Sequence, residues 1–299
     1  MADYLVLLGP TASGKTAISI ELAKQLSKLG YSPEIVNADS MQLYSEMDIA
    51  TAKLPLEQRE QIPHHMFDVS EPEQEMTVVQ YQQRARDVIT EIIDRGSLPI
   101  LVGGSMLYLQ AVVYKMDFAP TDQQVREQLE AELSETGAEA MLARLQEVDP
   151  ESAERIELGD TRRIIRALEL YQLRGRGLDE FRKDPGFWRD CEIFGIEVDR
   201  EILRERINKR VENMWEMGLV PEAEKLRGRL STTASAAIGY QQVEKYIDGE
   251  ITKEEAIQQI QLLSTRYAKR QRTWFGRDRN IHWLSPEIAV EEIISKARL

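Results

Sequence analysis

The stretch "LLGPTASGKTAIS" at residues 7–19 constrains the fold of this 299-residue chain more than any other feature. It fits the phosphate-binding pattern G-x-x-x-x-G-K-[ST], with Gly9, Gly14, Lys15 and Thr16 at the four fixed positions. This pattern binds phosphate when it lies between a β-strand and an α-helix, so the residues on either side of it decide its meaning.

The flanking segments have the required character. The apolar run "DYLVLL" (3–8) predicts a buried strand, and "TAISIELAKQLSKLG" (16–30) predicts a helix closed by Gly30. We expect the backbone N–H groups of residues 11–16 to surround a diphosphate, with the Lys15 ammonium between two phosphate groups and the Thr16 hydroxyl on a Mg²⁺ ion. The predicted diphosphate site consists of Gly9, Thr11, Ala12, Ser13, Gly14, Lys15 and Thr16.

The following segments predict an α/β fold, a P-loop NTPase-like parallel sheet flanked by helices. "PEIVNAD" (33–39) and "LPILVGG" (98–104) read as buried strands, and residues 78–96 have helical spacing. We expect His64 and His65, after Pro63, to shape the loop between residues 39 and 78. Ligands of such sheets lie at the carboxyl ends of the strands. The glycine loop, "ADSMQ" and "GGSMLY" all follow strands and should converge on one pocket.

A change of character divides the chain. Residues 116–190 carry charged, amphipathic helices without strand signals, which predicts an all-helical insertion domain. Residues 1–115 and 191–299 then form the P-loop core domain with its C-terminal helices. "CEIFGIEVD" (191–199) should rejoin the sheet, and the remainder reads as helical, including a long helix over 253–275.

Composition and charge limit the classes of function. No apolar run reaches the roughly 18 residues that a membrane span needs, and the first residues lack signal-peptide features, so we expect a cytoplasmic protein. One cysteine and three histidines make a metal held by protein side chains alone unlikely. The net charge of −13 argues against nucleic-acid binding on average, yet residues 160–176 and 265–279 are rich in arginine. These stretches are either solvated helix faces or two phosphate-binding stripes.

Phosphate binding does not by itself imply phosphoryl transfer. Nucleotide hydrolases usually end an apolar strand with an acidic Mg²⁺ ligand, whereas "LPILV" ends in Gly103, Gly104 and Ser105. The aspartate that does end a strand is Asp39. A carboxylate beside a diphosphate suits general base catalysis or contact with Mg²⁺, and the alternative is a cap for a following helix.

Motifs along nearly the whole chain resemble the tRNA dimethylallyltransferase family. They are "GPTASGKT", "NADSMQLYSEMDIATAK", "IPHHMFDV", "LPILVGGSMLYLQA", "DTRRIIRALELY", "RINKRVENMWEMGL", "AIGYQQ" and "YAKRQRTWF". The resemblance implies a Mg²⁺-dependent prenyltransferase that moves a dimethylallyl group from dimethylallyl diphosphate to N6 of the adenosine at position 37, beside the anticodon in the tRNA anticodon stem-loop. In that case the loop binds a prenyl diphosphate in place of ATP.

The resemblance also assigns roles to residues. Asp39 is the general base, Lys15 and Arg210 assist the diphosphate with Arg206 as the alternative arginine, and Ser105 stands where the family commonly has threonine. On the C-terminal helix, Arg266, Lys269, Arg270 and Thr273 share one face by their spacing. The expected tRNA-binding residues are Asp39, Ser40, Met41, Gln42, Ser105, Arg126, Arg162, Arg163, Ile164, Ile165, Arg166, Arg266, Lys269 and Arg270.

Three other functions stay open at this point. The first is prenyl transfer to a free adenine nucleotide, as in an adenylate isopentenyltransferase, and the second is a P-loop small-molecule kinase that uses ATP. The third is a non-catalytic RNA-binding protein that keeps the loop as part of its fold. The helical insertion and the basic C-terminal helix favour a macromolecular substrate, and nothing in the sequence requires more than a monomer.

Overall fold

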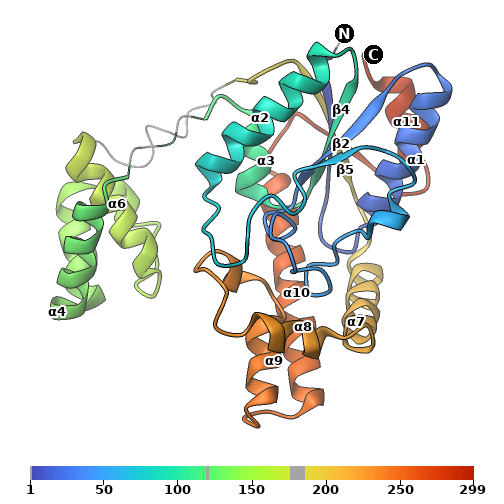
Figure 1. Ribbon diagram of the computed structural model, residues 1–299. Helices are drawn as coiled ribbons and strands as arrows, with labels where there is room; N and C mark the ends of the chain where they lie inside the picture. The colour runs from blue at the N-terminus through green and yellow to red at the C-terminus, as the bar shows by residue number, and fades with distance from the viewer. Residues whose placement is uncertain (1, 117, 119–120, 176–185) are drawn as a thin grey trace. The chain divides into compact units, whose positions relative to one another are not determined.

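A computed structural model describes residues 2–116, 118, 121–175 and 186–299 (Figure 1). The chain divides into two compact units. One, which we call the core unit, comprises Met1–Val113 and Phe187–Leu299, and the other, the helical unit, comprises Tyr114–Gly186. The insertion predicted from the sequence, at 116–190, begins and ends within four residues of the helical unit.

The core unit contains a six-stranded sheet in the order β3-β2-β4-β1-β5-β6, and every pairing is parallel. The strands are β1 (Tyr4–Leu8), β2 (Pro33–Ala38), β3 (His64–His65), β4 (Leu98–Gly103), β5 (Cys191–Ile196) and β6 (Ile281–Leu284). All residues of β1, β2 and β4 are buried, as the apolar runs predicted for a sheet covered on both faces.

Two strands correct the expectations from sequence. His64 and His65 do not lie in a loop, because they pair with Ile35 and Val36 as the short edge strand β3. The chain after residue 199 is not wholly helical either, since β6 pairs with β5 at the other edge. Both strands are too short and too polar to produce a clear apolar run, and their partners in the sheet stabilise them.

Helices cover both faces of the sheet, as predicted (Figure 1). α1 (Lys15–Lys28) packs with α11 (Ala289–Lys296) on one face, and α2 (Val78–Asp94) packs with α3 (Met106–Val113) on the other. The apolar core between the sheet and α1 includes Leu5, Leu7, Leu22 and Leu26. Burial of these side chains is the main force that holds the helices on the sheet.

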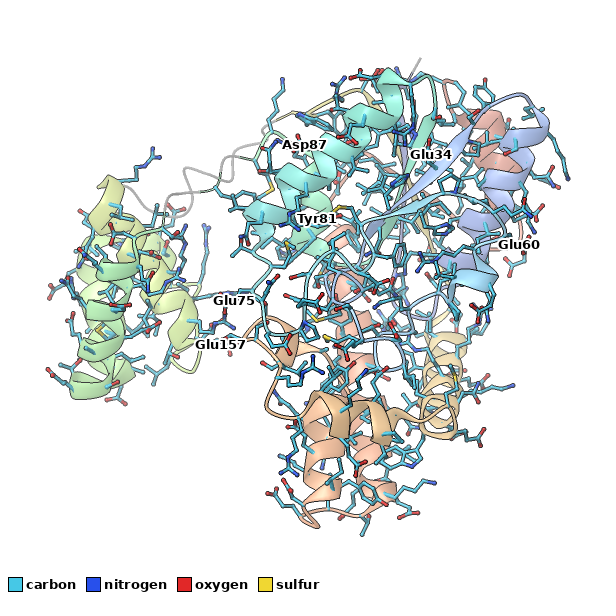
Figure 2. The ribbon with its side chains drawn as sticks, in the orientation of Figure 1. Glu34, Glu60, Glu75, Tyr81, Asp87 and Glu157 are labelled. Carbon is cyan, nitrogen blue, oxygen red and sulfur yellow. The ribbon has the colours of Figure 1, made fainter. Side chains whose placement is uncertain are left out.

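α2 also reaches the end of the sheet where the site lies. A capping box between Thr77 and Gln80 starts this helix. The side chain of Tyr81 points from α2 toward the sheet, and its hydroxyl donates to the Asn37 carbonyl at 2.9 Å (Figure 2). This bond fixes the carboxyl end of β2, two residues before Asp39.

Four further helices lie beyond the carboxyl ends of the strands. They are α7 (Arg200–Glu216), α8 (Leu219–Leu226), α9 (Tyr240–Ile247) and α10 (Lys253–Phe275). A capping box between Thr252 and Glu255 begins α10, and its buried positions recur at helical spacing from Ala256 to Phe275. This stripe leaves Arg266 and Lys269 exposed and turns Gln271 inward.

The helical unit has an apolar core of its own. Its helices are α4 (Gln123–Val148, interrupted at Gly137), α5 (Pro150–Ala153) and α6 (Thr161–Arg174). Asp160 caps the start of α6 and Gly175 its end. None of the helices among the described residues combines the length and apolar character needed to cross a membrane.

Candidate active site

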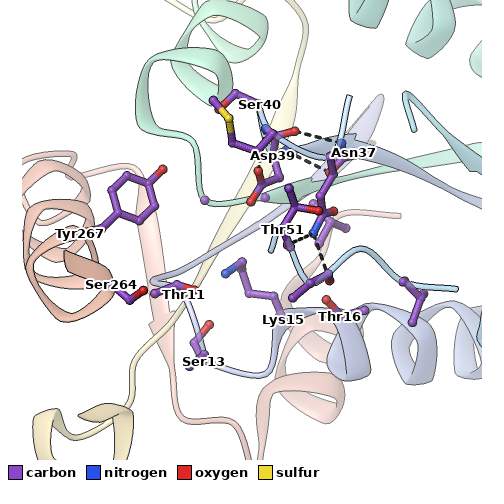
Figure 3. Close-up of a pocket in the computed structure, with 18 of the residues that line it drawn as sticks. Thr11, Ser13, Lys15, Thr16, Asn37, Asp39, Ser40, Thr51, Ser264 and Tyr267 are labelled. Carbon is purple, nitrogen blue, oxygen red and sulfur yellow. Dashed lines mark hydrogen bonds between the residues drawn. The ribbon is translucent and has the colours of Figure 1, made fainter. Parts of the chain in front are cut away.

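A cavity of about 530 Å³ opens at the carboxyl ends of β1, β2 and β4. These strands are neighbours in the sheet, so the segments that follow them meet at one edge. The three polar segments predicted to converge do so, and α7 and α10 complete the walls (Figure 3). The lining includes the loop residues Thr11, Ala12, Ser13, Gly14, Lys15 and Thr16, then Asp39, Ser40, Met41, Gln42, Gly103 and Gly104, and from the helices Arg210, Met214, Tyr267, Arg270 and Gln271.

The glycine loop has the geometry of an anion site. Ala12 and Gly14 adopt left-handed backbone angles, with φ of 62° and 91°, which turn the loop around the start of α1. Gly14 gives α1 no side-chain cap, so the N–H groups of the first turn remain available at the positive end of the helix dipole. Two N–H groups of the predicted set are already used: Thr11 donates to Gln271 Oε1 at 2.8 Å and Ser13 to the Pro10 carbonyl at 3.3 Å.

Three charged groups meet in the cavity. Lys15 and Asp39 point toward the same space (Figure 3), and Arg210 lies close enough to influence the pKa of both. Burial lowers the pKa of Lys15 to about 8, against the attraction of Asp39 and together with the repulsion of Arg210. Burial raises the pKa of the Asp39 carboxyl, although the Met41 N–H, Lys15 and Arg210 oppose the rise. Two partly buried cations beside one carboxylate leave an excess of positive charge for an anionic ligand.

Asp39 is held by its own backbone segment. Its Oδ1 accepts from the Met41 N–H at 3.0 Å, and its N–H donates to Asn37 Oδ1 at 3.0 Å. The carboxylate therefore caps a tight turn, while no helix starts here, so the alternative of a helix cap is wrong. The carboxylate also accepts from the Gln42 N–H, and Asp39 lines the cavity.

Ser105, predicted as a catalytic residue, lies behind the wall of the cavity. It is buried, its Oγ accepts from the Ser40 N–H at 2.9 Å, and the two serine hydroxyls lie 3.0 Å apart. It also contacts the hydroxyl of Tyr267 on α10. Ser105 therefore positions the residue after Asp39, and it is absent from the residues that line the cavity.

α10 contributes five lining residues whose place in the cavity the sequence did not reveal: Ile260, Ser264, Tyr267, Arg270 and Gln271. Gln271 is 2% exposed and joins the Thr11 N–H of the glycine loop to the Gly104 carbonyl, which it contacts through Nε2 at 2.8 Å. Tyr267 reaches the cavity one turn earlier, with the Arg270 guanidinium 5.8 Å from its ring centroid. A Cβ at Gly104 would lie 2.5 Å from Gln271 Nε2, so this contact requires glycine.

On α7 the structure distinguishes between the two candidate arginines. Arg210 lines the cavity and its Nε is buried without a hydrogen-bond partner. Arg206 does not line the cavity, and its charge instead helps to lower the pKa of Glu287. Met214, one turn after Arg210, is buried and faces the cavity, so it contributes an apolar surface.

Of the basic stripe on α10, Arg266, Lys269, Arg270 and Thr273 are all exposed. Arg270 also lines the cavity, whereas Arg266 and Lys269 do not. The exposed acidic side chains Glu60, Glu75 and Asp87 lie on other elements of the core unit (Figure 2). The negative net charge and a local basic surface therefore coexist.

The expected tRNA-binding residues of the helical unit differ in their surroundings. Ile164 and Ile165 pack in the core of that unit, so the expectation that their side chains contact RNA is wrong. Arg126 and Arg166 both bind the buried carboxylate of Glu169, at 3.1 and 2.7 Å. Arg162 and Arg163 are exposed on the first turn of α6. On an amphipathic helix, exposed positions alternate with buried ones, so the two residues between Arg163 and Arg166 face the core.

Comparisons with known proteins point to one family. The family model described as IPP transferase matches residues 42–279. The chain is 45% identical over 287 residues to a tRNA dimethylallyltransferase of Thermobifida fusca, a match that covers 95% of this chain and 90% of the relative. A tRNA isopentenylpyrophosphate transferase from Bacillus halodurans has a similar structure, with a TM-score of 0.71, 38% identity and coverage of 98% and 95% of the two chains. A eukaryotic dimethylallyltransferase acting on tRNA aligns with a TM-score of 0.81 and 25% identity, over 99% of this chain and 80% of its own.

Proposed function

The chain belongs to the IPP transferase family, and on this premise we propose that it transfers the dimethylallyl group of dimethylallyl diphosphate to N6 of an adenosine in tRNA. The observation that supports this most directly is the cavity itself. It brings the cationic glycine loop and Arg210 to the same space as the partly buried carboxylate of Asp39. The acceptor is the adenosine at position 37, beside the anticodon.

The reaction breaks the allylic C–O bond of the donor, and the bonding electrons leave with the diphosphate. The Lys15 ammonium, the Arg210 guanidinium and the free N–H groups of the first turn of α1 stabilise this developing charge. Because Lys15 and Arg210 are partly buried and in place before the reaction, their electrostatic effect is larger than in water.

The nucleophile is the exocyclic amine of adenine, which is a very weak base. Its nitrogen attacks the allylic carbon, and Asp39 accepts the proton as the new C–N bond forms. Burial raises the pKa of Asp39, which improves its basicity, while Lys15 and Arg210 favour the charged carboxylate and limit this rise. A stacked loop base cannot reach a cavity at a strand end, so the adenine must leave the stack.

The residues present fit a Mg²⁺ ion that arrives with the diphosphate. No group of three or more His, Cys, Asp or Glu gathers as a ligand set in the part of the chain that the structure describes. The hydroxyl of Thr16 and the carboxylate of Asp39 line the cavity, and Mg²⁺ is commonly bound by one or two protein oxygens together with substrate phosphates. We propose Thr16 as the protein ligand, and the ion would add positive charge beside the leaving group.

Labelled substrates test the proposal and separate it from the alternatives. The protein is incubated with dimethylallyl diphosphate labelled in the prenyl group, with tRNA or AMP as acceptor, and in parallel with γ-labelled ATP. We expect the prenyl label on adenosine in tRNA and no transfer of phosphate. Label on AMP alone would support a free-nucleotide prenyltransferase, and phosphate transfer would support a kinase.

A further inference from the structure

The segment 48–53, "DIATAK", forms a wall of the cavity without belonging to the sheet. Ala50, Thr51 and Ala52 line the cavity, and the turn contains a left-handed residue, Ala52, with φ of 52°. Backbone hydrogen bonds within the segment are local, from Ala52 to Ile49 and from Lys53 to Asp48. Side chains hold it in place, among them Lys53 of the segment itself, whose ammonium donates to the Tyr44 carbonyl and to the Asp68 carboxylate, both at 2.6 Å.

A second anchor is Glu222 on α8. Its carboxylate accepts from three successive backbone N–H groups: Oε2 from Asp48 at 3.0 Å and Ile49 at 2.7 Å, and Oε1 from Ala50 at 3.0 Å. Oε1 also accepts from the Tyr240 hydroxyl of α9 at 2.9 Å. Successive N–H groups form a concave anion site, and here the anion is a side chain of the same protein.

The backbone around Glu222 is shaped to allow this contact. Gly218 and Gly239, which precede α8 and α9, have φ of 105° and 126°, angles that L side chains rarely adopt. A Cβ at Gly239 would lie 3.3 Å from Ala50 Cβ. The glycines of "MGL" and "AIGYQQ" thus bring α8 and α9 close to the segment 48–53.

The segment in turn orients Gln42. The Nε2 of Gln42 donates to the carbonyls of Thr51 at 3.0 Å and Ala52 at 3.3 Å. Two carbonyl acceptors determine which end of the amide lies there, because only the amino group can donate to both. The backbone N–H of Gln42 also bonds to the carboxylate of Asp39. Gln42 therefore links the wall to the general base.

We propose that Glu222 is a positioning residue, which holds the wall at 48–52 and through it fixes Gln42 beside Asp39 for the entry of the acceptor base. The inference rests on the proposed function for the identity of the acceptor. Different residues then hold the two sides of the cavity. Gln271 and α1 hold the side that binds the diphosphate, and Glu222 holds the side that receives the base.

The test is Glu222→Gln, with Glu224→Gln as the matched control. Both remove one negative charge from α8, and Glu224 is exposed. Glutamine presents one oxygen and one amino group where four donors converge, so the wall should shift. We expect kcat/KM for tRNA to fall by about tenfold or more, since small misplacements of reacting groups are costly. The Kd for dimethylallyl diphosphate should change by less than about twofold, because its groups lie on the glycine loop.

A double-substitution cycle distinguishes positioning from a general loss of stability. If Glu222 acts through Gln42, Gln42→Met should cost about tenfold in the native background and little more after Glu222→Gln, whereas independent effects multiply to about a hundredfold. Tyr240→Phe removes one of the four hydrogen bonds and is the milder partner for the same cycle if Glu222→Gln does not fold. Multiplying effects, or a Glu222→Gln protein equal to the control, would overturn the proposal. An unsubstituted protein that prenylates no tRNA would instead refute the proposed function.

Discussion

Gln271→Met should damage both the stability and the donor site of this protein. Gln271 is 2% exposed, and both ends of its amide are used, at 2.8 Å to the Thr11 N–H and 2.8 Å to the Gly104 carbonyl. Methionine fills a similar volume but leaves both backbone groups without partners. An unsatisfied buried group costs about 1–3 kcal/mol, so the loss of two partners should lower the free energy of unfolding by about 2–6 kcal/mol.

Urea unfolding at 25 °C measures this difference, with Gln261→Met on the same helix as the control. Gln261 Nε2 makes one long hydrogen bond, 3.4 Å to the Asn208 carbonyl, so its loss should cost less than about 1 kcal/mol. Gln271→Met should also weaken binding of dimethylallyl diphosphate by about tenfold, because the glycine loop loses a fixed point. Equal unfolding curves for the two variants, with unchanged donor affinity, would refute the reasoning.

Three further outcomes can be checked in the same system. Burial lowers the pKa of Lys15 to about 8, so kcat/KM for the donor should fall about tenfold between pH 7 and pH 9 as the ammonium loses its proton. Lys15→Arg should abolish this fall, because arginine keeps its charge over that range. An equal fall in the variant would assign the titration to another group. Asp39→Asn should lower the single-turnover rate by at least about a hundredfold with tRNA affinity changed far less, whereas a proportional loss of tRNA binding would make Asp39 a binding residue. Replacing Arg266 and Lys269 with alanine should weaken tRNA binding and reduce its salt slope by roughly one per lost phosphate contact, and an unchanged slope would identify a solvated helix face.

The sequence by itself determined the local elements of this protein. The buried strands, the phosphate loop and the long helix α10 follow from apolar runs, glycine positions and capping residues that lie close together in the chain. Asp39 could be chosen because it directly follows a buried strand, and parallel strands place their carboxyl ends at one edge. Such features need no knowledge of distant partners.

Tertiary structure decided which of several plausible side chains enter the site. In the sequence, Gln271 is one polar residue of a basic helix, and its role follows only from the hydrogen bond of its amide to a loop 260 positions away. The role of Glu222 likewise follows from the hydrogen bonds of its carboxylate to backbone 173 positions away. Ile164 and Ile165 are a further case. They belong to the same motif as three arginines, but their side chains pack in the core of the helical unit. The physical reason is that hydrogen bonds and burial depend on distance in space, whereas periodicity and capping record only distance along the chain.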